Sequence, residues 1–368
     1  MKKHLLGQLV IASTLLAASF GHGQTSLLST NDNFQPVSLD AQPPDTRNRI
    51  SLSYRMGLNI TADFRKLGGF TNMTDFGPAA GGATDRNYDN GYNRVDVTGN
   101  NHGPGFDNTT WNWGYASGSS VQGNSLVLSS SSSPANGVSN NHNNDPQHGF
   151  EITYDRELFR DERDWRYGLE GAFGYTLLSI DDHQTVRTVV NQVNDSFALP
   201  SGFVAPPPGY QGTYQGPGPV IGSVPVTRSS TNITSAATIE GERSLDANIF
   251  SFRLGPYAEI PLDKKFSLLF SGGLYLAAGE MQFGFREKVT IDGVAGSQIH
   301  SGSGSQTDFL VGGYVGGNVE YALTKDVGLF VGAQFQTAGQ AITNARGKES
   351  ILDMGQAVVV SIGASYSF

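Results

Sequence analysis

The sequence predicts an all-β protein, a transmembrane antiparallel up-and-down β-barrel of about eight strands with short turns at one rim and long loops at the other. Three observations carry this prediction. Eight segments alternate apolar and polar residues with a period of two. The connections between them alternate between short and long, and the last segment ends on an aromatic residue, Phe368. Such strands suit a barrel in lipid, because each strand presents one face to hydrocarbon and the other to the interior.

The alternation is clear in residues 51–65, where Leu52, Tyr54 and Met56 share one face and Ser53 and Arg55 share the other. The closing segment, 356–368, alternates in the same way with a single lapse at Val359. The eight predicted strands are residues 51–65, 150–159, 165–179, 248–262, 266–278, 308–323, 327–336 and 356–368.

The connections indicate the topology. Residues 160–164, 263–265 and 324–326 are short and charged, which is typical of periplasmic turns. Residues 68–148, 181–243, 284–307 and 337–354 are long and rich in Gly, Ser, Asn and Pro, which is typical of extracellular loops. An even strand count places both chain ends at one rim, where the first and last strands pair and remove the free edges.

Two alternatives stay open. Parts of the first two long loops form either hairpins above the membrane, which we expect, or added spanning strands, for a total of ten to twelve. The low-complexity stretches 129–133 and 140–144 in these loops are expected to be mobile.

The other alternative is that the fold is a soluble β-sandwich, but a sandwich does not need such uniformly apolar strand faces.

The amino terminus is typical of a secretory signal. Lys2 and Lys3 precede an apolar stretch over residues 5–20, and small residues follow. We expect residues 1–23 to be a cleaved signal peptide and 24–48 a flexible periplasmic segment before a barrel over 49–368. A transmembrane anchor is the alternative, but the apolar stretch is short for one.

Composition narrows the function classes. The chain has 47 Gly and 0 Cys in 368 residues, which suits a turn-rich β protein and leaves no disulfide framework and no lipid-anchoring cysteine. The net charge of -9 argues against nucleic acid as a partner, since nucleic acid favours basic surfaces.

Charged residues gather on the predicted lumen face. An eight-strand barrel is just wide enough for side chains to fill it, so desolvated charges there must pair. We expect an Arg–Glu network that plugs the lumen, with a gating or permeation role as the alternative. Counting from the short turns puts Arg55, Glu157, Arg166, Glu170, Glu259 and Glu320 in the periplasmic half, Arg253 higher, and Asp63, Arg65, Glu151 and Asp155 toward the extracellular rim.

The closing strand carries a resemblance. Its alternation and its aromatic residues Tyr366 and Phe368 resemble the terminal strand of outer-membrane β-barrel proteins, where this pattern is the signal for the barrel-assembly machinery. In strand number, turn asymmetry and inward charges the chain is similar to the small barrels of the OmpA transmembrane domain and OmpX. The resemblance implies a location in the cell outer membrane, among its lipids and lipopolysaccharide.

The expected function is a structural or surface-interaction role, with an extracellular ligand bound through the long loops. Their aromatic residues favour contact with a partner, although hairpins also need aromatics for packing: Trp111, Trp113, Tyr115, Tyr210 and Tyr214. A small-solute pore is the alternative, and an enzyme acting on lipid or peptide is a remote one. The loop histidines favour a metal or catalytic site only weakly, so no cofactor and no catalytic residue is assigned: His102, His142, His148, His183 and His300.

Overall fold

The computed structural model describes residues 48–80, 84–95 and 108–368. In these residues the regular elements are β-strands and one short 3-10 turn, and no helix is long and apolar enough to cross a bilayer. The predicted signal peptide and nearly all of the predicted segment 24–48 lie outside the described residues, as does His102. Asn48, the last residue of that segment, begins the first strand.

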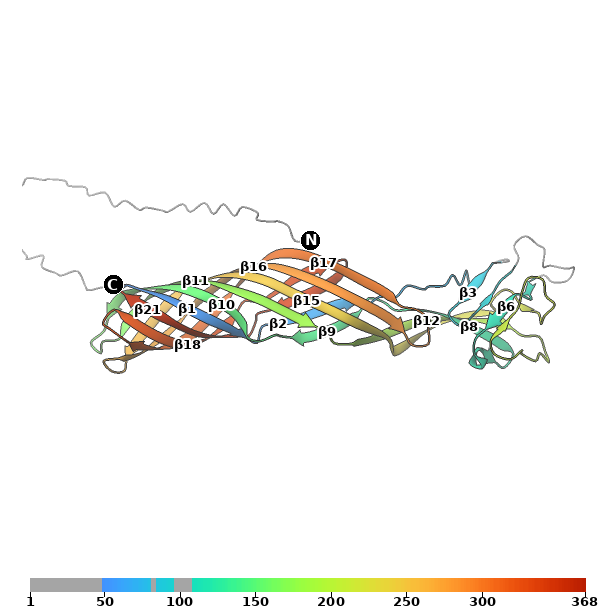
Figure 1. Cartoon of the computed structure of the whole chain (residues 1–368), viewed down its shortest axis with the longest axis horizontal. Helices are drawn as coiled ribbons and strands as arrows, with labels where there is room; N and C mark the ends of the chain where they lie inside the picture. Colours follow the sequence, from blue (N-terminus) through green and yellow to red (C-terminus); the bar gives the residue numbers. More distant parts are fainter. Residues whose placement is uncertain (1–47, 81–83, 96–107) are drawn as a thin grey trace, which may run out of the picture. The chain divides into compact units, whose positions relative to one another are not determined.

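Eight long strands pair as antiparallel neighbours in a closed cycle, which we call the ring (Figure 1). The cycle closes because β11 pairs with β15 as well as β10, and because β1 pairs with the last strand, β21. In cyclic order the ring strands are β1 (Asn48–Leu58), β10 (Gln147–Arg160), β11 (Arg166–Asp182), β15 (Thr227–Pro261), β16 (Phe266–Ile291), β17 (Gln298–Ala322), β18 (Val327–Thr337) and β21 (Ala357–Ser367).

The first described residue and the last residue of the chain meet at one end of the ring. The backbone N–H of Asn48 donates to the carbonyl of Phe368 at 2.9 Å, and the reverse bond is 2.8 Å. We call this end the C-terminal rim. The short turns 161–165, 262–265 and 323–326 also lie between ring strands there. The chain has further strands, described below, so the predicted total of about eight strands is too low.

Side chains alternate around the ring between an exposed apolar outer face and a buried polar inner face. On β1, Ile50 and Leu52 are exposed, whereas Ser51, Ser53 and Arg55 are buried. Because successive side chains of a strand point to opposite faces, the same alternation produces both the apolar outer face and the polar inner face. The exposed apolar side chains, which we call the belt, include Ile50, Leu52, Tyr54, Phe150, Ile152, Tyr154, Leu169, Phe173, Leu177, Phe250, Phe252, Leu254, Phe266, Phe270, Leu274, Phe309, Val311, Val315, Val319, Leu329, Val331, Phe335, Ile362, Tyr366 and Phe368.

The polarity of the two faces reverses partway along the longest strands. On β16 the outward residues become polar at Glu280 and Gln282, while the inward residues Met281, Phe283 and Val289 form an apolar core. The same reversal occurs on β15, where Asp246 and Glu242 are outward. On these strands the belt therefore ends, and the sheet continues with the polarity of a water-soluble protein.

A second sheet covers this apolar core. Its strands are β2 (Thr61–Leu67), β9 (Gly137–His142), β19 (Gln340–Ala345) and β20 (Lys348–Asp353), in the order β19-β20-β2-β9. Phe64 of β2 packs on Phe283 of β16 with ring centroids 5.7 Å apart. The layer that faces this sheet consists of the parts of β11, β15, β16 and β17 that lie beyond the belt. We call the two layers together the sandwich.

Residues 51–65, predicted as one strand, are two. Asn59 adopts a left-handed φ of 58°, which ends β1, and β2 then joins the other sheet. Asparagine tolerates this conformation better than most residues. Its backbone N–H donates to Asp145 and its side chain to the carbonyl of Gln356, both at 2.8 Å. The turn therefore ties together three of the connections that lead from ring strands to sandwich strands.

The remaining strands surround a separate small core, which we call the head. Its buried residues are aromatic and aliphatic: Tyr88, Trp113, Tyr115, Leu126, Leu128, Phe197 and Ile221. Its elements are β3 (Arg86–Tyr88), β4 (Gly91–Asn93), β5 (Thr109–Thr110), β6 (Trp113–Tyr115), η1 (Gly118–Ser120), β7 (Val121–Gln122), β8 (Ser125–Ser132), β12 (Val186–Ala198), β13 (Tyr210–Gln211) and β14 (Ile221–Gly222). Trp113 and Tyr115, expected as contact residues, are core residues instead.

Several predicted loops contain strands. Residues 284–307 belong largely to β16 and β17, and residues 337–354 contain the β19–β20 hairpin. The Gly/Ser composition of 298–307 has a structural cause: Ser301, Ser303 and Ser305 face outward, and Gly304 lies where a Cβ atom would be 2.0 Å from the carbonyl oxygen of Asn344. The serine tract 129–133, expected to be mobile, lies mostly in β8.

Candidate functional site

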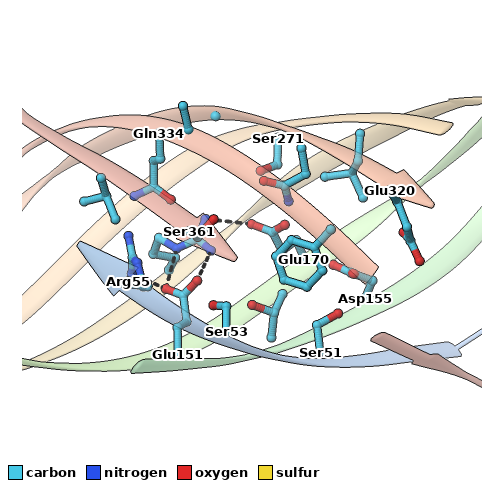
Figure 2. Close-up of a pocket in the computed structure, with 18 of the residues that line it drawn as sticks. Ser51, Ser53, Arg55, Glu151, Asp155, Glu170, Ser271, Glu320, Gln334 and Ser361 are labelled. Atoms are coloured by element: carbon cyan, nitrogen blue, oxygen red, sulfur yellow. Dashed lines mark hydrogen bonds and ion pairs between the residues drawn. The ribbon is translucent and has the colours of Figure 1, made fainter. Parts of the chain in front are cut away.

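The ring interior holds two groups of paired charges. In the first, Arg253 of β15 bonds Glu151 of β10 at 2.6 Å and Glu170 of β11 at 2.8 Å. Arg55 of β1 also bonds Glu151, and the Tyr314 hydroxyl donates to Glu170 at 3.0 Å. Figure 2 shows Arg55, Glu151 and Glu170 of this group converging in the interior. Two guanidinium groups and two carboxylates therefore neutralise one another across the interior.

The second group lies closer to the C-terminal rim and centres on Arg49 of β1. Its guanidinium contacts Asp155 at 2.9 Å, Glu259 at 3.1 Å and Glu320 at 2.8 Å. Arg166 bonds the other oxygen of Glu259 at 3.1 Å. Carboxylates from β10, β15 and β17 thus meet on one cation of β1, which links strands on opposite sides of the ring.

The space left by these side chains is small. A cavity of about 40 Å³ is lined by residues of both groups, including Arg49, Arg55, Glu170 and Arg253. That volume suits one or two water molecules rather than a solute path. Removing one member of a buried pair leaves an uncompensated charge, which costs about 3–5 kcal/mol. The network therefore both fills and braces the interior.

Most predicted lumen charges lie in or beside these groups. Glu157, for example, is buried on β10 and pairs with Arg160 at 3.0 Å. The two exceptions are Asp63 and Arg65. Asp63 and Arg65 lie on β2 of the sandwich, outside the ring, and pair with each other at 3.2 Å with the Arg65 side chain 48% exposed. Their placement in the lumen was wrong because the strand breaks at Asn59.

The predicted depths of Asp155 and Glu151 were also wrong. Asp155 pairs in register with Arg49 near the start of β1, and Glu151 pairs with Ser53. Both residues therefore lie closer to the C-terminal rim than expected. The predicted strand, residues 150–159, was shorter than the real one: β10 begins at Gln147, and its neighbour β11 continues into the sandwich.

Arg49 was missed by the sequence argument. It lies at the expected boundary between the leader and the barrel, just before the first predicted strand. The signal available was its parity: Arg49, Ser51, Ser53 and Arg55 occupy one face of an alternating segment. Tyr366 and Phe368 of the predicted assembly signal lie exposed on the outer face, with ring centroids 6.1 Å apart.

The sandwich core contains a separate buried ion cluster. Arg243 bonds Asp182 at 2.6 Å and Glu287 at 3.1 Å, and Lys348 bonds Glu287 at 2.9 Å. His142 Nε2 is 2.7 Å from Ser139 Oγ and 3.6 Å from an Asp182 oxygen. A nucleophile triad uses the two different nitrogens of the imidazole, so this arrangement does not match one.

The other described histidines are dispersed. His148 stacks on Tyr54, and His300 Nε2 lies 2.8 Å from the carbonyl oxygen of Gly69. His183 borders an outer pocket with Asp181 and Glu242. Among the described residues, no three His, Cys, Asp or Glu side chains are grouped so as to hold a metal ion.

Comparison with solved structures gives weak likenesses. Ail, the attachment invasion locus protein of Yersinia pestis, in complex with the heparin analogue sucrose octasulfate, aligns over 88% of this chain and 99% of its own, with 10% identity and a TM-score of 0.28. The outer membrane protease OmpT from Escherichia coli aligns over 89% and 98%, with 10% identity and a TM-score of 0.30. No family model matches the sequence, and no curated protein matches it. Likenesses this weak identify neither a family nor an activity.

Proposed function

We propose that the protein is an integral outer-membrane β-barrel protein with a charge-plugged lumen and a structural or surface-interaction role. One observation carries the proposal: the belt of exposed apolar side chains runs over all eight strands of the ring, while charged side chains fill the interior. In a soluble protein this apolar surface would be exposed to water, which is unfavourable. In a bilayer it would contact hydrocarbon instead.

The dimensions of the belt support a membrane span. On β16 the outward apolar residues run from Phe266 to Ala278. That segment rises about 28 Å at roughly 3.3 Å per residue and a tilt of about 45°, close to the apolar band of roughly 25 Å in such barrels. A row of cross-strand aromatic neighbours lies near the edge of the belt that is farther from the C-terminal rim: Tyr54, Phe150, Tyr175 and Phe250. Aromatic rows of this kind are typical of membrane–water interfaces.

The connections supply the orientation. The short turns lie at the C-terminal rim, which we place in the periplasm, and the sandwich and head then lie outside the cell. Outer-membrane lipids and lipopolysaccharide would surround the belt. The barrel-assembly machinery would read the closing strand through Tyr366 and Phe368. We also propose that residues 1–23 direct export of the chain and are then cleaved from it.

The filled interior favours a plug over a pore. Arg49, Arg55 and Arg253 each bond one or more carboxylates from other ring strands, and the cavity beside them has a volume of about 40 Å³. The proposal includes no catalytic role. A ligand would instead meet the head, whose compact core presents a stable surface beyond the lipid.

Membrane integration is tested with the full chain expressed in a Gram-negative host. We expect the protein in the outer-membrane fraction after carbonate washing, requiring detergent for extraction and migrating faster on gels before heating than after. A folded, monomeric protein in buffer without detergent would overturn the assignment of the belt to lipid.

The plug is tested by planar-bilayer recording of refolded protein. We expect no stable channel from the wild-type chain and an increased frequency of openings from Arg55→Ser, because this change removes a bulky cation from the interior. Arg65→Ser, on the sandwich surface, is the matched control and should stay closed. Stable wild-type channels would favour the small-solute pore instead.

A further inference from the structure

The serine tract of β8 forms part of an ordered polar surface in the head. Leu126 and Leu128 face the head core, and Val127, Ser129 and Ser131 face the opposite side. Because β8 pairs with β12 in register, Ser129 lies beside Asn194 and Ser131 beside Gln192. The core beneath fixes this face, so the polar side chains project from a rigid floor.

The polar rows continue onto the next strand. Asn194 of β12 pairs with Ser229 of β15, and Gln192 pairs with Thr231. Each row therefore runs hydroxyl, amide, hydroxyl across three strands. Such a surface offers donors and acceptors at regular spacing, because strands lie about 4.8 Å apart and same-face residues about 7 Å apart along a strand.

Two walls turn this floor into a groove. One wall is the β3–β4 turn at Asp89 and Asn90, together with Ser119 and Ser120 of η1. The other is the turn after β16, at 292–294. The groove has a volume of about 510 Å³, which falls in the range of small-molecule binding sites.

Hydrogen bonds fix the wall against the floor. The Asn90 side chain accepts from the Ser129 N–H at 2.8 Å and donates to Ser120 Oγ at 3.1 Å. Ser129 Oγ donates to Asn194 Oδ1 at 2.7 Å, so the Asn194 amide is held in one orientation. Within the described part of the chain the Gln192 side chain has no hydrogen-bond partner. The groove is therefore pre-organised and still has polar groups to offer a ligand.

The lining selects for uncharged, hydroxyl-rich chemistry. None of the described side chains lining the groove is Lys, Arg or His, which disfavours a polyanion. Its two carboxylates are Asp89 and Asp292. Burial raises the pKa of the Asp89 carboxyl, and Arg187 neutralises Asp292 at 2.5 Å. Amides and hydroxyls both donate and accept, so they are best matched by a ligand that does the same.

We propose that this groove binds a neutral glycan, with Gln192 and Asn194 as the principal hydrogen-bonding residues on its floor. Sugar hydroxyls donate and accept in the same way as the lining, and a short oligosaccharide fits the groove volume. The inference rests on the proposed function, because it uses the head as the surface displayed outside the cell.

The test is a binding titration with the full chain folded in a detergent that contains no sugar, such as a dimethylamine oxide. The probes are maltohexaose, cellohexaose, chitohexaose and mannohexaose, with heparin as the polyanionic comparator. We expect at least one neutral probe to bind. Gln192→Ala and Asn194→Ala should each weaken its association about tenfold, as expected for the loss of one or two ligand hydrogen bonds.

A matched control and a blocking variant sharpen the test. Asn191→Ala removes an exposed amide from the opposite face of β12 and should leave binding unchanged. Ser229→Trp fills the groove from an exposed position and should abolish binding. The inference is overturned if no neutral probe binds, if only heparin binds, or if Gln192→Ala and Asn194→Ala bind like the wild type. If the wild-type chain integrates into the outer membrane but binds no neutral probe, the groove inference fails and the proposed function still stands.

Discussion

The ring and the sandwich share strands but have opposite polarity. β15, β16 and β17 run through both regions without interruption. In the ring, Phe252 and Phe270 face outward and Arg253 and Glu259 face inward. In the sandwich, Asp246 and Gln282 face outward, and Phe283 is completely buried. Under the proposed function, one continuous sheet therefore meets two different solvents.

Strand alternation therefore identifies the two faces of a strand but does not say which face meets which solvent. In the proposed membrane location lipid would accept Phe270 on the outside, and the ring fills its interior with paired charges. Water accepts Gln282 on the outside, so the sandwich buries Phe64 against Phe283 instead. The same kind of substitution should consequently cost much more stability in the ring than on the surface of the sandwich.

The largest expected effect is on the interior charges of the ring. Arg49→Met removes the cation that Asp155, Glu259 and Glu320 share, and buried unpaired carboxylates are costly. We expect the free energy of unfolding in lipid vesicles, measured by urea titration, to fall by about 3–5 kcal/mol.

Arg65→Met is the matched control, since Arg65 forms one exposed pair on the sandwich. Its effect should stay within about 0.5 kcal/mol. Equal losses for Arg49→Met and Arg65→Met would contradict the view that desolvation inside the ring makes its ion pairs important.

The features that the sequence predicts well are those with a local signature. Period-two alternation located the ring segments, as on β1 and β17, because each residue reports its own face. Short charged connections marked the turns at 161–165, 262–265 and 323–326 for the same reason. Paired charges such as Arg253 and Glu170 were expected from their parity alone.

The features that it misses depend on contacts distant in sequence. Residues 298–307 were taken for a loop because glycine and serine favour loops, yet Gly304 is required by the close approach of Asn344. The break at Asn59 depends on Asp145 and Gln356, which no local pattern connects. The reversal of polarity at Glu280 was also missed, because β16 was ended where its outward apolar residues end.

A smaller effect is expected on the outer face. Phe270→Arg places a charge near the middle of the belt and should lower the free energy of unfolding in lipid vesicles by about 2–4 kcal/mol. Gln282→Arg, on the same face of β16 in the sandwich, should change it by less than about 0.5 kcal/mol. If both variants lost the same stability, the belt would not end between these two positions.

The head differs from the ring and the sandwich, because its polar groups are buried among aromatic residues. We expect its stability to fall at alkaline pH. Burial raises the pKa of Tyr88 above its ordinary value near 10, and the hydrogen bond to Asp195 at 2.5 Å raises it further. The folded head thus keeps the neutral phenol when the unfolded chain has ionised. The contribution of Tyr88 to stability is complete below about pH 10 and is lost as pH rises beyond it.

Tyr88→Phe removes this ionisation while Arg228 continues to pair with Asp195 at 2.6 Å. We expect the variant to lose about 1 kcal/mol at pH 8 through the missing hydrogen bond, and to lose less additional stability than the wild type between pH 9 and 11. Tryptophan fluorescence reports the transition, because Trp113 is fully buried in the head core. An alkaline transition identical in wild type and Tyr88→Phe would show that the Tyr88–Asp195 contact does not stabilise the head.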